Sequence, residues 1–130
     1  MRIDSPLPES HERMVTRVVD CAFTVHRELG PGFREKIYRR AFCLELESRG
    51  IPFETEKRIE VNYKRWRIPG QQVDLIVAGI VLVEIKTVPR LTELHRCQVR
   101  SYLKTLGLQI GLLVNFNTEL IKHGLRRVPN

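Results

Sequence analysis

The hydrophobic positions of the first fifty residues follow the period of two amphipathic helices. From about Ser10 to Leu29, apolar side chains recur every three or four residues, the spacing that places them on one helical face. That face consists of Val15, Val18, Val19, Ala22, Val25, His26 and Leu29. Gly30-Pro31-Gly32 ends the helix, and a second helix is predicted from about Phe33 to Arg49, before Gly50. Its inward face should contain Ile37, Tyr38, Ala41, Phe42 and Leu44.

Beyond Gly50 the period of the pattern changes to two, which is typical of strands. We expect strands over residues 53–56 and 59–63, then a short continuation over 66–68 that ends in a turn at Pro69-Gly70. The apolar residues on both sides of Gly79 should form the two strands of a hairpin.

A third helix is predicted from Leu91 to Leu106, entered after Pro89 and closed by Gly107. Residues 108–116 read as a buried strand, and residues 121–128 as an edge strand. The order is two helices, several strands, a helix and further strands. It predicts an α/β (α+β) protein with a mixed central β-sheet flanked by helices.

The chain length of 130 residues suits one domain with a single core. Residues 1–9, with two prolines, are expected to be a loose lead-in, and residues 10–130 to form the single domain. The longest apolar run, 75–83, is far shorter than the roughly 20 residues that span a bilayer. With no visible signal peptide, we expect a cytoplasmic protein that does not associate with membranes.

Cysteines and histidines do not suggest a metal site. Cys21, Cys43 and Cys97 are far apart in sequence and form no Cys-x-x-Cys pair, so neither a disulfide framework nor a zinc site is predicted. We expect reduced and mostly buried thiols. The four histidines also lack metal-ligand spacing.

Charge points to a polyanionic partner, since 22 basic and 15 acidic residues give a net charge of +7. Arg96, Arg100 and Lys104 repeat every four residues along the third helix. We expect them to form a basic ridge that contacts a nucleic-acid backbone. Aromatic residues are few, so no clear platform for stacking single-stranded bases is predicted.

Two acids and a lysine stand at the ends of the apolar hairpin, at Asp74, Glu84 and Lys86. An ionised carboxylate among apolar side chains is costly, and a divalent cation shared by two carboxylates compensates for that cost. The period of two places Glu84 and Lys86 on one face of their strand, with Ile85 on the other. The alternative is an ordinary surface pair on an amphipathic hairpin, which contributes little.

The hairpin loop decides whether the two acids share a face. A three-residue loop at 77–79, with Gly79 in the left-handed region, pairs Asp74 with Leu82 and places Asp74 diagonal to Glu84. That diagonal spans roughly 7–8 Å between backbones, so both carboxylates could reach one cation. A two-residue loop would instead put the acids on opposite faces.

Residues 32–38, Gly-Phe-Arg-Glu-Lys-Ile-Tyr, resemble the signature of the bacterial GxxExxY proteins, a group within the PD-(D/E)XK nuclease superfamily. The similarity runs from about Val15 to Val128 and includes Val-Asp-Leu at 73–75 and Val-Glu-Ile-Lys at 83–86. The resemblance implies a PD-(D/E)XK nuclease-like core. Such a core has a helix, a three-stranded meander, a second helix and a final strand around one magnesium-dependent site.

The same resemblance implies roles for individual residues. Asp74 and Glu84 would bind Mg²⁺ or Mn²⁺, the main-chain carbonyl of Ile85 would be a further ligand, and Lys86 would hold the attacking water. Glu35 fits the acid that superfamily members often supply from the first core helix. An acid near a helix N-terminus is also favoured by the macrodipole, whatever its function.

Gln98 and Tyr102 resemble the Gln-x-x-x-Tyr motif of RecB-like exonucleases, whose two side chains line the active site. A spacing of four places both on one helical face. Tyr38 is expected to pack, and His95 matches a frequent family histidine to which we assign no role. Gln72 departs from the family, where a basic residue often occurs.

The leading hypothesis is a magnesium-dependent phosphodiesterase that acts on nucleic acid, with DNA as the expected substrate. The alternative is a catalytically silent nucleic-acid-binding or assembly module with the same fold, because a fold does not fix a function. A hydrolase of nucleotides or other small phosphates would need a closed pocket, which the sequence neither shows nor excludes. The sequence does not determine the oligomeric state.

Overall fold

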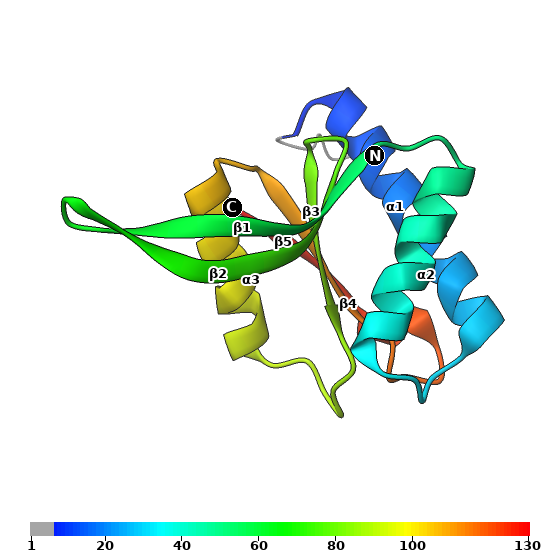
Figure 1. The fold of residues 1–130 in the computed structure, drawn as a ribbon. Coiled ribbons are helices and arrows are strands. Elements are labelled where there is room, and N and C mark those ends of the chain that lie inside the picture. Colours follow the sequence, from blue (N-terminus) through cyan, green and yellow to red (C-terminus); the bar gives the residue numbers. More distant parts are fainter. Residues whose placement is uncertain (1–6) are drawn as a thin grey trace, which may run out of the picture.

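The computed structural model describes residues 7–130 as a mixed five-stranded sheet with helices on both faces (Figure 1). The elements are α1 (Glu9–Leu29), α2 (Glu35–Ser48), β1 (Phe53–Tyr63), β2 (Trp66–Val77), β3 (Val81–Lys86), α3 (Glu93–Leu106), β4 (Ile110–Asn115), the 3₁₀ helix η1 (Ile121–Gly124) and β5 (Leu125–Pro129). The predicted α/β (α+β) class is confirmed. Of the expected lead-in 1–9, residues 1–6 lie outside the described residues, and α1 begins at Glu9.

The strands follow the order β1-β2-β3-β4-β5, and β3 and β4 form the parallel pair. Helix α3 connects these two strands, as a parallel pair requires a crossover. Helices α1 and α2 pack on one face of the sheet, and α3 packs on the other face. The core therefore has two halves, separated by the sheet.

The inward face of α2 differs in part from the prediction. Tyr38, Phe42 and Leu46 are buried, whereas Ile37 and Leu44 are exposed. The buried residues are four positions apart and form one row along the helix, and α2 contacts its neighbours along that row. Ile37 and Leu44 lie on the side of the helix away from this row and face solvent.

The free thiols agree with the expectation in part. Cys21 and Cys43 are buried in the core beneath α1 and α2, whereas Cys97 is exposed on α3. Within residues 7–130, no helix is long and apolar enough to cross a lipid bilayer.

The two expected short strands before the carboxylate hairpin are one continuous strand, β1, which pairs along its length with β2. The predicted turn at Pro69-Gly70 is wrong, because the chain reverses at Lys64 and Arg65, where Lys64 has φ 53. Pro69 and Gly70 instead form a bulge within β2, between the pairs Ile59–Gln71 and Val61–Ile68. A bulge tolerates a proline because the ladder is already interrupted there.

The loop between β2 and β3 is Ala78-Gly79-Ile80, one residue later than expected. Val77 pairs with Val81, which shifts the register by two residues from the predicted pairing of Asp74 with Leu82. A shift of two leaves every side chain on its face, so the predicted same-face arrangement survives. Gly79 has φ 67, as predicted, and Ala78 also has a positive φ of 54.

The C-terminal strands complete the sheet. Residues 108–116 were expected to form a strand, and β4 occupies the middle of this range. The expected edge strand over 121–128 is correct only from Leu125, because Ile121–Gly124 form a 3₁₀ turn. Gly124 passes so close to the Asn115 carbonyl oxygen that a Cβ would lie 2.1 Å from it.

Helix α3 lies close to β4 because Gly111 has no side chain. A Cβ at Gly111 would meet Cγ1 of Val99 at 2.7 Å and Cδ1 of Leu103 at 3.6 Å. Val99 and Leu103 are fully buried on the sheet-facing side of α3. The distance between α3 and the sheet therefore depends on this glycine.

We predict that Gly111→Ala lowers the free energy of unfolding by about 1–3 kcal/mol, because it overpacks the contact between α3 and β4. Val99→Ala in the same chain should relieve the clash, so the double variant should be less destabilised than the sum of the two single variants. Urea unfolding of the wild type and the three variants measures this. Strictly additive changes would contradict the proposed contact.

Candidate active site

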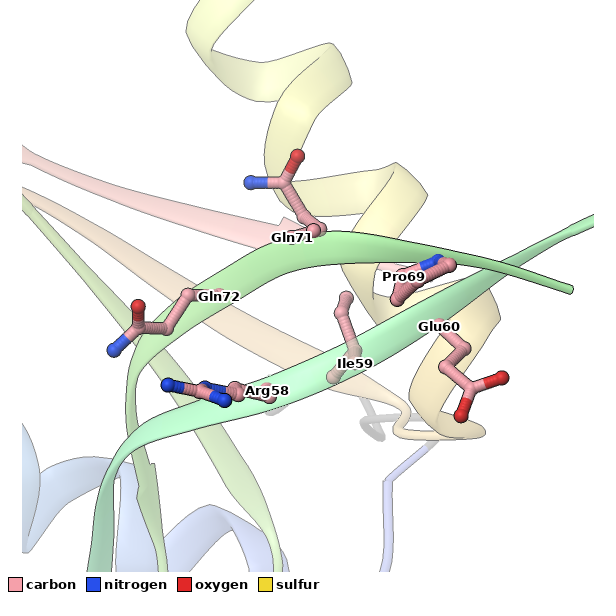
Figure 2. Close-up of a pocket in the computed structure, with 7 residues that line it drawn as sticks. Arg58, Ile59, Glu60, Pro69, Gln71 and Gln72 are labelled. Atoms are coloured by element: carbon pink, nitrogen blue, oxygen red, sulfur yellow. The ribbon is translucent and has the colours of Figure 1, made fainter.

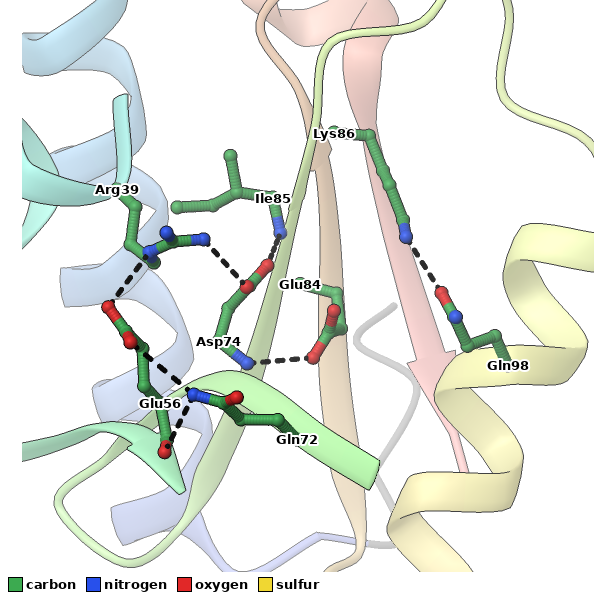
Figure 3. A network of polar contacts seen from close by, with 8 residues as sticks. All are labelled: Arg39, Glu56, Gln72, Asp74, Glu84, Ile85, Lys86 and Gln98. Carbon is green, nitrogen blue, oxygen red and sulfur yellow. Dashed lines mark hydrogen bonds and ion pairs between the residues drawn. The ribbon is translucent and has the colours of Figure 1, made fainter. Parts of the chain in front are cut away.

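Asp74 and Glu84 lie side by side where β2 and β3 separate. The backbone ladder between the strands ends at the pair Leu75–Val83, and the next pair in this register is Asp74 and Glu84. At this point the two carboxylates accept hydrogen bonds from backbone N–H groups of the opposite strand, in place of the backbone carbonyl groups. Asp74 N–H donates to Glu84 Oε1 at 3.0 Å, and Ile85 N–H donates to Asp74 Oδ2 at 2.8 Å (Figure 3).

Glu84 is only 4% exposed. Burial raises the pKa of Glu84 to about 8, and the negative charge of Asp74 contributes to the same shift. The hydrogen bond from Asp74 N–H and the charge of Lys86 act in the opposite direction. Two neighbouring carboxyls of which one is buried therefore carry an electrostatic cost that the described residues offset only in part.

Arg39 of α2 is a site residue that the sequence analysis missed. Its Nη1 lies 3.3 Å from Asp74 Oδ1, and its Nε lies 3.6 Å from Glu56 Oε1. Gln72 Nε2 also donates to Glu56, and these side chains border a pocket of about 190 Å³ (Figure 3). One sequence feature could have indicated its position: Arg39 follows Glu35 by four residues, so both lie on the same helical face.

Glu35 stands in the first turn of α2. Burial raises the pKa of the Glu35 carboxyl, the charge of Asp74 raises it further, and Lys86 and Arg39 lower it. Glu35 thus lies within the electrostatic field of the pair. Across residues 7–130, no three His, Cys, Asp or Glu side chains are close enough together to hold a metal ion, so Glu35 as a third ligand stays a prediction.

Tyr38 and Gly32 fix the start of α2 at this site. The Tyr38 hydroxyl donates to Gly30 O at 2.5 Å and accepts from Phe33 N–H at 3.1 Å. Its ring stacks on Phe116 with centroids 4.5 Å apart, as the expected packing role requires. Gly32 has φ 112, which favours glycine. In the motif of residues 32–38, glycine and tyrosine hold the loop, and the loop positions Glu35.

Lys86 and two residues of α3 border the carboxylates on the side away from α2. Lys86 Nζ donates to Gln98 Oε1 at 2.8 Å. The Tyr102 hydroxyl accepts from Gln71 Nε2 at 2.5 Å. The pKa of Tyr102 is raised, mainly by burial and then by the charges of Glu84 and Asp74. The predicted shared face of Gln98 and Tyr102 is therefore the face that reaches the sheet.

The other predicted residues of α3 lie outside this cluster. His95 caps the helix, since its Nδ1 accepts from Thr92 N–H at 2.9 Å. Arg100 forms an ion pair with Glu93 at 3.2 Å, Arg96 is half-buried and Lys104 is exposed. Their role in contacting nucleic acid stays a prediction.

We predict that stability decreases as the pH rises from about 4.5 to about 8 because of Glu84. With a raised pKa in the folded state, Glu84 binds a proton more tightly when folded, so unfolding becomes easier as that proton is lost. The slope contributed is at most about 1.4 kcal/mol per pH unit.

Urea unfolding across this pH range, without divalent cations, tests the assignment. Glu84→Gln keeps an acceptor for Asp74 N–H and should flatten the pH dependence. Glu28→Gln removes an exposed acid of α1 and should leave it unchanged. Equal slopes in the wild type and Glu84→Gln would contradict the assignment.

The family model of the PD-(D/E)XK nuclease superfamily matches residues 12–128 of this chain. Members of that superfamily generally use divalent metal ions and act on nucleic acids. No curated protein and no solved structure matches the chain. The match spans both helices before the carboxylate hairpin and every strand of the sheet. The chain belongs to the PD-(D/E)XK nuclease superfamily.

Proposed function

We propose that this protein is a Mg²⁺-dependent nuclease of the GxxExxY type that hydrolyses phosphodiester bonds in DNA. The observation that carries the proposal is the pair of Asp74 and Glu84 at the separation of β2 and β3, with Lys86 two residues further on. Two adjacent acids, of which Glu84 is buried and Asp74 half-buried, have little structural benefit by themselves, because a carboxylate removed from water is stable only when its charge is offset.

The donor set fits a hard divalent cation such as Mg²⁺ or Mn²⁺, which prefers oxygen ligands. Asp74 and Glu84 would hold it, with the main-chain carbonyl of Ile85 and the carboxylate of Glu35 as further ligands. A bound cation supplies Lewis-acid polarisation of the scissile phosphate and lowers the pKa of the attacking water. Binding would also relieve the repulsion between the two acids, and Asp74 would exchange Arg39 for a stronger counter-charge.

Lys86 is the residue best placed to act on the reacting groups. Gln98 accepts a hydrogen bond from its ammonium group, which fixes the direction of a long and otherwise flexible side chain. A positive charge fixed beside the carboxylate pair would orient a water molecule and stabilise negative charge that develops during attack. Tyr102, held by Gln71, would limit the space on the α3 side.

One observation favours the alternative, a silent nucleic-acid-binding module. The Arg39 guanidinium already neutralises Asp74 within the chain, so the site has a counter-charge without a metal ion. In a silent module this ion pair would be permanent. In a nuclease it would be displaced by the cation, so metal binding separates the two functions.

We predict that MgCl₂ raises the melting temperature of the wild type, because a ligand that binds only the folded state stabilises it, by about 2.7 kcal/mol at 100 times its Kd. Asp74→Asn should show no such rise. Differential scanning fluorimetry with increasing Mg²⁺, and with chelator as the reference, measures this. Glu28→Gln serves as the matched control and should respond as the wild type does. Equal responses in Asp74→Asn and the wild type would exclude a metal site here.

We also predict that substitutions at Lys86 and in the basic ridge of α3 have different effects on DNA cleavage and DNA binding. Lys86→Ala should lower the cleavage rate about 10²–10³-fold, the usual cost of losing one charge-stabilising donor. Its DNA affinity should be nearly unchanged, since one positive charge contributes little to counterion release. Replacing Arg96, Arg100 and Lys104 by Ala should weaken binding to all sequences and flatten its salt dependence.

The assays use linear, circular and single-stranded DNA with Mg²⁺ or Mn²⁺, and Asp74→Ala as the inactive control. Loss of the circular substrate would show endonuclease action. If the wild type binds DNA with a steep salt dependence but never cleaves it, the silent module is correct. If it neither binds nor cleaves, the assignment to nucleic acid fails.

A further inference from the structure

The β1–β2 hairpin extends well beyond the rest of the sheet (Figure 1). Strands β1 and β2 have 11 and 12 residues, whereas β3 and β4 have 6 each. Every residue from 60 to 70 is exposed, so neither face of this part of the ribbon packs on the core. We call residues 60–70 the hairpin arm. Nothing in the core explains its length.

The hairpin arm carries aromatic side chains at its tip. Tyr63 and Trp66 face each other across the two strands and stack with centroids 6.4 Å apart. They are 54% and 49% exposed, which is unusual for large rings. Arg65 lies 4.1 Å from the centre of the Trp66 ring, and Lys64 lies 5.5 Å from the centre of the Tyr63 ring. The tip is thus both apolar and cationic.

The charge of the hairpin arm indicates which class of partner it binds. It contains Lys64, Arg65 and Arg67 against a single acid, Glu60. Among the ion pairs formed by residues 7–130, none involves these three cations. Association of two copies through their tips would bring six positive charges together. A polyanion matches the surface instead.

A pocket of about 350 Å³ lies along the hairpin, at the base of the hairpin arm (Figure 2). It is lined by Arg58, Ile59, Glu60, Pro69, Gly70, Gln71 and Gln72. Gln71 contacts Tyr102 and Gln72 contacts Glu56, so its inner end adjoins the candidate active site. Polar and charged side chains of both strands therefore line this pocket, which connects the candidate site with the base of the hairpin arm.

We propose that the hairpin arm binds duplex DNA by lying in its major groove, with Lys64, Arg65 and Arg67 on the phosphates. A two-stranded ribbon fits the B-form major groove, about 12 Å wide, whereas the deep and narrow major groove of A-form RNA excludes it. The proposal rests on the proposed function for its substrate class and adds a binding element outside the catalytic residues.

The geometry also gives the reach of this element. Trp66 precedes Asp74 by eight residues on β2, which corresponds to about 25 Å of extended strand. At about 3.4 Å per base pair along the duplex axis, the tip would contact the duplex at most about seven base pairs from the scissile phosphate, because a ribbon in the groove runs at an angle to that axis. The hairpin arm would therefore hold a substrate whose cleavage site lies at the carboxylate pair.

Trp66 is the single tryptophan of the chain, so its fluorescence reports on the hairpin arm directly. In chelator, adding duplex DNA of about 20–30 base pairs, longer than the expected reach, should quench Trp66 emission with the same Kd that DNA anisotropy gives. Duplex RNA of the same sequence should quench it less.

The variant Lys64→Ala/Arg65→Ala/Arg67→Ala keeps the fluorescent residue Trp66 and removes the three cations. Its slope of log affinity against log salt should fall by up to about 3, as expected for three lost phosphate contacts. The matched control Arg13→Ala/Arg17→Ala/Arg27→Ala removes three exposed arginines of α1, on the other side of the molecule, and should bind nearly as the wild type does.

Several results would overturn the proposal. These are DNA binding without a change in Trp66 emission, equal salt slopes in the two triple variants, or quenching by duplex RNA or single strands as strong as by duplex DNA. A change of emission with protein concentration alone would indicate association of two copies instead. DNA should quench the Trp66 emission of Asp74→Asn as it does in the wild type. A protein that binds DNA in this way without cleaving it would therefore still confirm the proposed role of the hairpin arm. A nuclease whose Trp66 emission does not change on DNA binding would refute it.

Discussion

The burial of the Glu84 carboxyl beside Asp74 is the constraint around which the remaining polar groups are arranged. The strands that carry the acids separate at this point, and each carboxylate accepts an N–H group of the other strand. These bonds replace the backbone ladder and hold the two acids together despite their charges. The positive charges of Arg39 and Lys86, one from α2 and one from β3, then offset part of the repulsion.

The helices α2 and α3 border the site from two sides, and the position of each helix depends on a close contact in the core. On the α2 side, the Tyr38 hydroxyl and ring fix the loop that begins the helix, and Glu35 and Arg39 follow from it. On the α3 side, Gly111 permits the close approach of the helix that brings Gln98 to Lys86. The chemistry proposed here therefore depends on residues that touch no substrate.

The long β1–β2 hairpin has two parts with different surroundings. Its inner half packs on the core and carries Asp74, so it is rigid where the carboxylates must be held. Its outer half is exposed throughout and carries cations and aromatic rings. Within the inner half, Glu56, with φ 50, lies beside Asp74 in the register and pairs with Arg39. Catalytic precision and substrate capture would thus be separated along one hairpin.

The sequence by itself determined the helices, the sheet class and the pairing of Asp74, Glu84 and Lys86 on one hairpin, because hydrophobic period and side-chain alternation are local properties. The same-face arrangement of the acids was correct although the predicted register was wrong by two residues, since parity is insensitive to such a shift. Local turn preferences gave a wrong prediction at Pro69-Gly70, because pairing with β1 makes these residues a bulge within β2 and not a turn.

Only the tertiary structure placed Arg39 and Glu56 at the carboxylates and Gln71 at Tyr102, because these contacts join segments whose approach is set by packing. It also decided that Ile37 and Leu44 face solvent. A helical period defines a face only to within the angle at which the neighbouring elements dock. Burial gave Glu84 its raised pKa, and burial depends on the whole fold rather than on the neighbours in sequence.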